Sequence, residues 1–425
     1  MIRVAILTGL LLLASTAGAE NLEEAWAAAL ASHRQIAAAE SQTEAAGANL
    51  ERAQSERMPQ LGVTSSFTQL DEAPRFDFGG QTSQKLFAND NFTTAGVQLS
   101  LPLYAGGGIG AGVDAAEAAK TASDGQLRAV VKDIKLGTGE HYIAVLRAES
   151  ALAVAESNVA TLTALTDDAK NRFDVGDVPK NDYLATSVSL ANAEQRRLQA
   201  RNALAYAREA YNRFLGRPLD QPVSLDPTLA IDDLLPAGEN LDALILRALE
   251  QRDELASLSS MAASLRDQST VARSRSRPQF ALTGGYMYLE NQFLTADDYW
   301  MAGLSFQWAP FDGGRSRHEA AALQYRADAV GHTRDDLATE IELEVRRRWH
   351  DRQEALSRTR VTETAVEQAI ENLKVVRDRY AAGASANVEV LDAEALRQQA
   401  LSNRDDARYG HVLATLRLAR ATGRL

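Results

Sequence analysis

An internal duplication constrains the fold of this 425-residue chain more than any single motif does. At an offset of 219 residues, Pro59-Gln60-Leu61 matches Pro278-Gln279-Phe280, and after the offset changes to 207 residues, Gly106-Gly107 matches Gly313-Gly314. The change, 219 minus 207, leaves 12 additional residues in the first copy, around Asp71 to Phe92. A loop tip absorbs an insertion at small entropic cost. We therefore predict two copies of one structural unit.

The duplication divides the sequence into four segments. Residues 1–19 have the basic residue, the short apolar run and the small-residue cleavage site before Glu20 that are typical of a secretory signal peptide. The first repeat is predicted at 20–215 and the second at 240–425. Four prolines in the segment 216–239 predict a linker that wraps the outside as a strap.

Each copy is predicted to form one β-hairpin, because apolar and polar residues alternate along it. The strands are expected at 60–69, 94–103, 279–288 and 299–308, about the length that crosses a bilayer, with aromatic residues near their ends. No later segment has the roughly 20 apolar residues of a membrane-spanning helix, so membrane insertion would require strands. A half-buried sheet in a soluble protein gives the same alternation, and the pattern alone leaves both interpretations open.

One amphipathic helix is expected before each hairpin and two long helices after it. The first helices are predicted near 21–58 and 240–277, each with an N-cap asparagine and a following proline. The later helices are predicted at 110–171, 180–215, 315–379 and 387–421, where apolar residues recur at the spacing of coiled coils. A helix of about 60 residues is roughly 90 Å long, which indicates a tube or a rod.

Composition and missing motifs exclude several classes of function. The chain has no cysteine, so it has no disulfide, zinc–thiolate site or thiol nucleophile. A formal net charge of −12 argues against nucleic acid as a partner. The six histidines lack metal-ligand spacing, there is no Gly-x-Ser-x-Gly elbow, and Gly106–Gly110 lacks the Lys-Ser/Thr of a phosphate-binding loop. We predict no enzymatic activity, no cofactor and no metal.

The number of strands predicts an oligomer. Four strands cannot close a barrel around a lumen, and an open edge in lipid leaves backbone groups unsatisfied at several kcal/mol each. Two protomers would supply eight strands and a packed interior, whereas three supply twelve and leave room for a channel. We therefore predict a homotrimer.

These features resemble the TolC-type outer-membrane efflux family. The resemblance rests on the Pro-Gln-Leu strand starts, the strand ends Pro102–Gly107 and Trp308–Gly314, and the helix tips Arg172–Gly176 and Arg379–Gly383, which follow in the same order in both copies. It implies an α+β membrane protein of two tandem repeats, forming a trimeric 12-stranded β-barrel in the outer membrane joined to a 12-helix periplasmic α-barrel with an equatorial belt. It also implies a periplasmic adaptor and an inner-membrane transporter as partners.

The turns between the long helices are candidate contact sites. Glycine allows the left-handed cap that ends a helix, so ordinary turn chemistry explains these residues as well. The resemblance implies that they contact the adaptor. The residues are Gly176, Asp177 and Val178 in the first copy and Gly383, Ala384 and Ser385 in the second.

An acidic pair follows the second turn only. Glu389 and Asp392 are three residues apart and share a helix face, which on an ordinary helix is a solvated surface. In a trimer they would bring six carboxylates together and favour cations. The resemblance implies that they line the closed periplasmic aperture, and that Tyr380 and Asp182 link neighbouring coiled coils. A basic residue that the family places two positions after the tip glycine is Ser385 here.

The sequence therefore predicts an outer-membrane channel protomer, a passive exit duct for efflux or type I secretion in contact with outer-membrane lipid. Drugs, metal ions and secreted proteins are all compatible with such a duct. Two alternatives are a periplasmic coiled-coil scaffold that never enters lipid and a self-standing porin that conducts without a partner.

Overall fold

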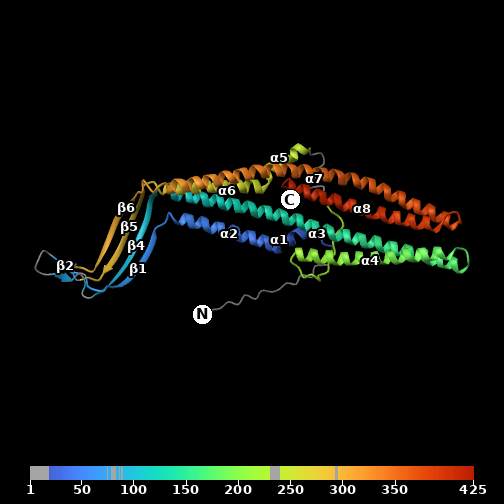
Figure 1. Ribbon diagram of the computed structural model, residues 1–425, viewed down its shortest axis with the longest axis horizontal. Coiled ribbons are helices and arrows are strands. Elements are labelled where there is room, and N and C mark those ends of the chain that lie inside the picture. The colour runs from blue at the N-terminus through green and yellow to red at the C-terminus, as the bar shows by residue number, and fades with distance from the viewer. Residues whose placement is uncertain are drawn as a thin grey trace. The chain divides into compact units, whose positions relative to one another are not determined.

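The computed structural model describes residues 19–73, 75–77, 83–85, 87, 90–229, 240–291 and 295–425. Its elements are α1 (Leu22–Ser32), α2 (Arg34–Ser55), β1 (Gln60–Gln69), β2 (Arg75–Asp77), β3 (Ser83–Lys85), β4 (Asn91–Ala105), α3 (Gly108–Asp174), α4 (Lys180–Phe214), α5 (Leu241–Gln251), α6 (Asp253–Ser274), β5 (Gln279–Leu289), β6 (Asp298–Gln307), α7 (Arg315–Ala381) and α8 (Asn387–Ala421) (Figure 1). Nearly all of the predicted signal peptide and part of the predicted linker, 230–239, lie outside the described residues.

The tandem repeat of helices, hairpin and long helices is confirmed. The helices of the first copy have the same lengths as their counterparts in the second: 11 residues for α1 and α5, 22 for α2 and α6, 67 for α3 and α7, and 35 for α4 and α8. Between β1 and β4 the first hairpin also carries the short strands β2 and β3. The 12 additional residues fall in this region, part of which lies outside the described residues.

The helix expected before each hairpin is two helices, so the prediction of one continuous helix was wrong. His33 and Arg252 adopt extended backbone angles, with ψ of 122° and 115°. The His33 N–H still donates to Ala29 O, and the His33 carbonyl accepts from Ile36 N, so the residue ends α1 and begins α2. Neither break contains glycine or proline, which are the usual sequence signals for a helix end.

The chain divides into two compact units, and each combines segments of both repeats. The first unit is Met1–Ala37, Ala129–Arg252 and Thr339–Leu425, and the second is Ala38–Arg128 and Asp253–Ala338. Helices α3 and α7 run through both units.

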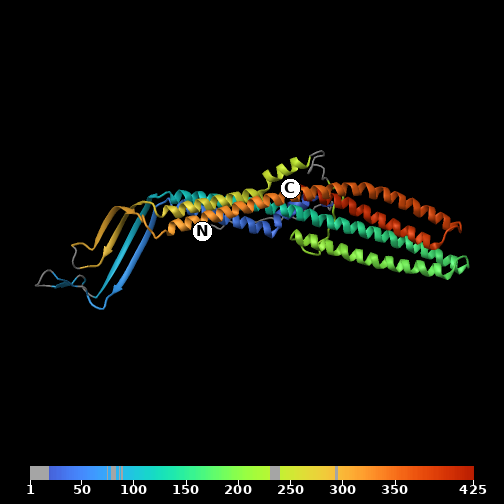
Figure 2. The same cartoon turned by 45° about the horizontal axis from the view of Figure 1, so that its top comes forward.

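The second unit contains an antiparallel sheet in the order β1-β4-β5-β6 (Figures 1 and 2). Its helices pack closely through small residues. Ser264 Oγ on α6 donates to the Ala115 carbonyl on α3 at 2.7 Å, and Ser269 Oγ donates to the Ala320 carbonyl on α7 at 2.9 Å. These bonds satisfy hydroxyls that are buried between the helices.

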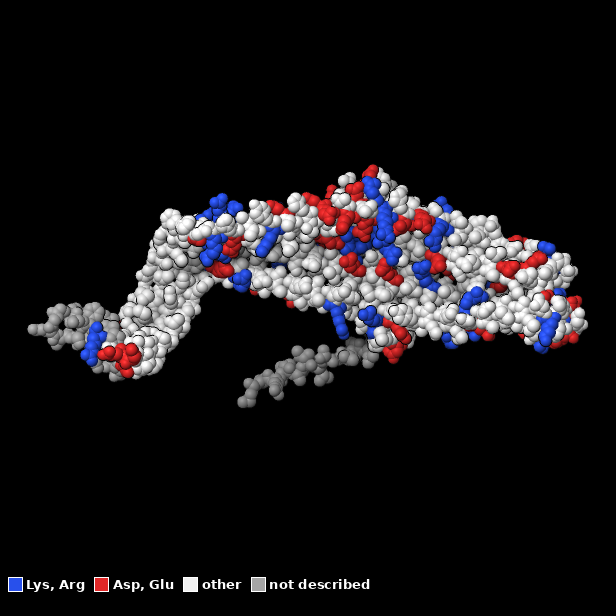
Figure 3. Space-filling view, viewed as in Figure 1, with Lys and Arg blue, Asp and Glu red and all other residues white. Residues whose placement is uncertain are grey.

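One face of the sheet is apolar and exposed. The register places Val63 opposite Val97, Val97 opposite Tyr286, and Tyr286 opposite Trp300, so these side chains form one row across four strands. Val63 is 75% exposed and Trp300 is 81% exposed. The visible face of the sheet carries few charged side chains, in contrast to the helices (Figure 3). An apolar surface of this kind marks a site that another molecule or a membrane covers.

In the first unit the start of the described chain is anchored by a partly buried polar network. Glu20 forms an ion pair with Arg217, with an O–N distance of 2.6 Å, and its carbonyl accepts from the hydroxyl of the fully buried Tyr142. Its backbone N–H donates to Ser224 O, which fixes the segment after α4. Burial raises the pKa of Tyr142, which therefore stays a neutral donor. None of the helices described is both long enough and apolar enough to cross a membrane.

Two adjacent glycines in β5 provide a test of the sheet. A Cβ on Gly285 would lie 2.6 Å from the Val97 carbonyl oxygen, whereas a Cβ on Gly284 would lie 3.7 Å from its nearest neighbour, Met301 O. Gly285→Ala is therefore expected to lower the free energy of unfolding by about 1–3 kcal/mol, the usual effect of overpacking. Gly284→Ala is the matched control and should leave stability unchanged. Equal melting temperatures for the two variants would contradict the close approach of β4 and β5.

Candidate functional site

The turns between the long helices have the same backbone geometry in both copies. Gly176 and Gly383 have φ of +82° and +71°. Beyond them Asp177 N donates to Arg172 O, and Ala384 N donates to Arg379 O, each at 2.8 Å. This bond from the third residue after the helix to the last helical turn is the Schellman cap, which requires a left-handed residue. The glycine positions identified in the sequence are the positions that need glycine.

The tip residues are mostly exposed. Gly176, Asp177, Gly383 and Ala384 are exposed, and Val178 and Ser385 are half-buried. Val175, which the sequence analysis did not select, is the most exposed apolar side chain of the first turn, at 81%. The surface of the tips is therefore formed by backbone, short side chains and the exposed Val175.

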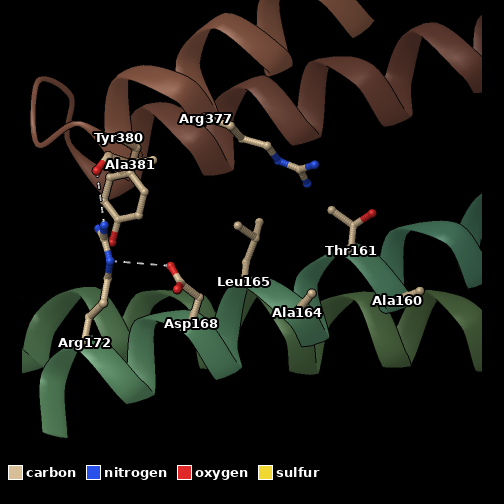
Figure 4. A pocket seen from close by; sticks show the side chains of 9 residues that line it. All are labelled: Ala160, Thr161, Ala164, Leu165, Asp168, Arg172, Arg377, Tyr380 and Ala381. Atoms are coloured by element: carbon tan, nitrogen blue, oxygen red, sulfur yellow. Dashed lines mark hydrogen bonds and ion pairs between the residues drawn. The ribbon is translucent and has the colours of Figure 1, made fainter.

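The tips of α3 and α7 are joined by Arg172 (Figure 4). Its guanidinium lies 4.9 Å from the centre of the Tyr380 ring and donates to the Ala381 carbonyl at 3.4 Å. Asp168 and Asp177 lie 3.8 and 3.6 Å from the same guanidinium and hold it in place. A cation on an aromatic face contributes about 0.5–2 kcal/mol, depending on burial.

Tyr380 and Asp182 both lie where the α3/α4 helix pair meets the α7/α8 helix pair. No hydrogen bond joins one to the other among the described residues. The Tyr380 ring packs with Leu373, Val390 and Ala393. Its hydroxyl is buried and has no hydrogen-bond partner among the described residues. Asp182 contributes its backbone carbonyl, which accepts from the Asn387 side-chain amide at 3.1 Å.

Asn387 was not identified from the sequence. It is 3% exposed and is the first residue of α8, so its amide is held rigidly against the start of α4. A buried polar side chain that bonds across two helices fixes their relative position, because the broken bond would leave an unsatisfied group. The equivalent residue of the first copy is Lys180, and this difference between the copies was the available signal.

Glu389 and Asp392 are exposed side chains on consecutive turns of α8. The Glu389 carboxylate accepts from Ser385 Oγ at 2.8 Å and lies 3.9 Å from the Arg379 guanidinium. Ser385 thus binds the acidic residue of its own turn. The part of the chain that the structure describes offers Asp392 no ion-pair partner. An exposed pair such as Arg379–Glu389 is worth at most about 1 kcal/mol.

A buried carboxylate one turn further along was also missed. Glu394 is 1% exposed, forms an ion pair with Arg397 at 2.6 Å and lies 3.8 Å from Arg377. The first copy has Lys170, Ser187 and Leu190 at the positions of Arg377, Glu394 and Arg397. Removing one partner of such a group leaves a buried charge, which costs several kcal/mol.

A groove of about 580 Å³ opens between α3 and α7 beside these contacts (Figure 4). Ala160, Ala164 and Leu165 line it from α3, and Arg377 extends along it from α7. Arg172 and Tyr380 close the end nearest the tips. The groove has short side chains along the α3 wall and two cations, Arg172 and Arg377, and its lining residues form no catalytic arrangement.

The sequence is similar to curated proteins over most of its length. In curated proteins it is 24% identical over 422 residues to the outer membrane protein TolC of Vibrio cholerae, covering 97% of this chain and 93% of the relative. It is 23% identical over 313 residues to the alkaline protease secretion protein AprF of Pseudomonas aeruginosa, covering 70% of this chain and 62% of the relative.

Solved structures show the same fold. The chain aligns with a structure of CusC with a TM-score of 0.81 and 18% identity, covering 95% of this chain and 92% of that one. It aligns with the open state of the Neisseria gonorrhoeae MtrE outer membrane channel with a TM-score of 0.75 and 17% identity, covering 95% and 88%. The model of the outer membrane efflux protein family matches residues 26–217 and 244–424. The chain belongs to the outer membrane efflux protein family.

Proposed function

We propose that the chain is one protomer of a homotrimeric exit duct in the outer membrane that extends into the periplasm. The observation that carries the proposal is the duplicated unit of hairpin and long helices, which matches the family over both copies. The protomer contributes a path and a gate, and a partner supplies the energy.

The unpaired edges of the sheet support the trimer. Strands β1 and β6 are the edges of the order β1-β4-β5-β6, and each is 10 residues long. Edge strands in lipid leave backbone groups without partners, so closure requires another copy. Three copies of four strands give a 12-stranded barrel with room for a channel. The row from Val63 to Trp300 then faces the lipid.

The partners that we propose for the turns between the long helices are suggested by the relatives. AprF is named as a secretion protein for alkaline protease, and the CusC and MtrE structures are those of transmembrane or outer-membrane channels. We infer that the exposed turns at Gly176–Val178 and Gly383–Ser385 contact a periplasmic adaptor, which connects the duct to an inner-membrane transporter. Their backbone and small side chains suit close approach by a helical partner.

The gate combines the acidic pair with the contacts between the helix pairs. Three copies of Glu389 and Asp392 around the axis form two acidic rings that favour cations and narrow the aperture. The Arg172–Tyr380 and Asn387–Asp182 contacts hold the α3/α4 and α7/α8 pairs together in the closed state. An adaptor opens the duct by making contacts that favour the separated helices, because a partner shifts an equilibrium only by its difference in affinity.

The duct is tested by single-channel conductance of the detergent-purified protein in a planar bilayer, with its oligomeric mass measured in parallel. We expect a trimer with small, cation-selective conductance that is closed most of the time. A particle that is released from cells without detergent and does not insert would instead support a periplasmic scaffold. Large conductance without any partner would support a self-standing porin.

The acidic rings are tested by the double variant Glu389→Gln with Asp392→Asn. Cation selectivity should fall and conductance should change, because six carboxylates leave the constriction. Glu363→Gln with Glu367→Gln removes the same charge from exposed positions on α7 and is the matched control. Unchanged selectivity and conductance in the first variant would remove Glu389 and Asp392 from the aperture.

The contact between the helix pairs is tested by Asn387→Ala. Loss of a buried hydrogen bond worth about 0.5–1.5 kcal/mol should raise the ratio of open to closed time roughly two- to tenfold. Asn181→Ala is the control, because Asn181 is exposed at the neighbouring turn and the structure, where it describes the chain, assigns no bond to its amide. Equal open times in both variants would show that the bond to Asp182 does not hold the gate closed.

A further inference from the structure

Several ion pairs join the first copy to the second within one chain. For one of them, the equivalent residues of the other copy also have opposite charges but do not form an ion pair. On α8, Arg420 Nε lies 2.7 Å from Asp133 Oδ1 on α3. Transfer of each residue to the equivalent position of the other copy, 207 residues away, gives Arg213 for Arg420 and Glu340 for Asp133. Both charges are therefore present twice in the sequence.

Arg213 and Glu340 are unpaired in the single chain. Both side chains are exposed, and within the described ranges neither has an ion-pair partner. Arg213 is at the end of α4 and Glu340 is on α7, the counterparts of the helices that carry Arg420 and Asp133. The Arg420–Asp133 ion pair joins α8 of the second copy to α3 of the first. The equivalent residues on α4 and α7 have no ion pair within the described part of the chain, so they are available to a neighbouring chain.

A second ion pair also has equivalents of opposite charge in the other copy, with the signs exchanged. Arg128 Nε on α3 lies 2.6 Å from Asp253 Oδ1 at the start of α6. The equivalent positions of the other copy are Asp335 and Arg34. Both partners have changed sign together, so the pair stays complementary although neither residue type is retained. Two unrelated substitutions on a solvated surface would not be expected to compensate each other.

The surroundings of Arg34 and Arg213 fit a protein partner. Arg34 and Arg213 line one pocket of about 720 Å³, beside His33 and Phe214. Arg34 is the first residue of α2 and has no carboxylate beside it, because the first turn of α2 contains no acidic residue, whereas α6 begins with Asp253 and Glu254. Asp335 already lies 2.9 Å from Arg334, but its side chain is 67% exposed, so a contact across the interface would add to the interactions that it makes within its own chain.

We propose that these residues form the charged contacts between neighbouring protomers, Arg213 with Glu340 and Arg34 with Asp335 of the adjacent chain. The inference rests on the proposed homotrimer, in which copies one and two alternate around a ring. Each copy then meets the other copy on both sides, once within its chain and once across the interface. The ion pairs within the chain therefore predict ion pairs at the equivalent positions between chains.

One ion pair within the chain has no charged equivalent between chains. The pair Arg417–Glu140, at 2.8 Å, becomes Ala210 and Arg347, which cannot form an ion pair. Both interfaces therefore share the two charged contacts named above and differ elsewhere. This difference distinguishes the surface within a chain from the surface between chains and favours correct pairing of protomers.

The charged contact is tested by exchanging its members in the full-length protein. Arg213→Glu and Glu340→Arg each place like charges together three times in a trimer, and each should lower the dissociation temperature of the trimer by about 1–2 °C. The double variant restores the pair and should recover most of the loss. Arg360→Glu and Glu363→Arg, at exposed positions of α7 without ion pairs among the described residues, are the controls.

A cross-linking experiment shows which chain supplies the partner. The chain has no cysteine, so Arg213→Cys with Glu340→Cys introduces the only two thiols. A short bismaleimide should give covalent dimers and trimers on a denaturing gel, because the two positions meet between chains. Cross-linking that leaves only monomers would overturn the proposal, as would a double charge variant no more stable than the single ones. If the unmodified protein is not trimeric, the proposed function fails before this question arises.

Discussion

Close packing of helices through alanine, serine and glycine is the interaction on which the rest of the structure depends. Ser264 and Ser269 reach the backbone of the neighbouring helices directly. In the first unit, a Cβ on Gly139 would lie 2.8 Å from Leu416 Cδ1. Each contact at such a distance is worth only a fraction of a kcal/mol, but it recurs along helices of 67 residues. Small residues at these contacts leave room for a few large buried side chains, such as Tyr142 and Leu416, in a chain whose aromatic residues form only 6%.

Much of the architecture was predictable because it repeats or alternates. The offsets of 219 and 207 residues identified the two copies, and period-two alternation located the hairpins. The breaks at His33 and Arg252 were not predictable, because these residues favour a helix as well as their neighbours do and only tertiary packing selects the extended angles. In the candidate site the tip glycines were predictable, since positive φ demands them. The partners of Tyr380, Glu389 and Glu394 were not, because side-chain pairing between helices leaves no periodic signal.

The two copies provide a common scaffold, and their differences provide the candidate chemistry. The second copy has Glu389 and Asp392 where the first has Asp182 and Ala185, and it has the buried Glu394 where the first has Ser187. The backbone of the two turns is nevertheless the same. Charge can therefore change in one copy without altering the fold, since exposed substitutions have small effects on stability.

The equal lengths of corresponding helices limit how this chain can change over evolutionary time. Arg172 near the end of α3 contacts Tyr380 near the end of α7, so both helices must place their ends at the same level. Adding one turn to α3 alone would displace its end by about 5.4 Å and separate the two residues. Gain or loss of length in the helices must therefore occur in both copies together, and by whole turns. The hairpin tips bear no such constraint, and the first already exceeds the second by the 12 residues between the two offsets.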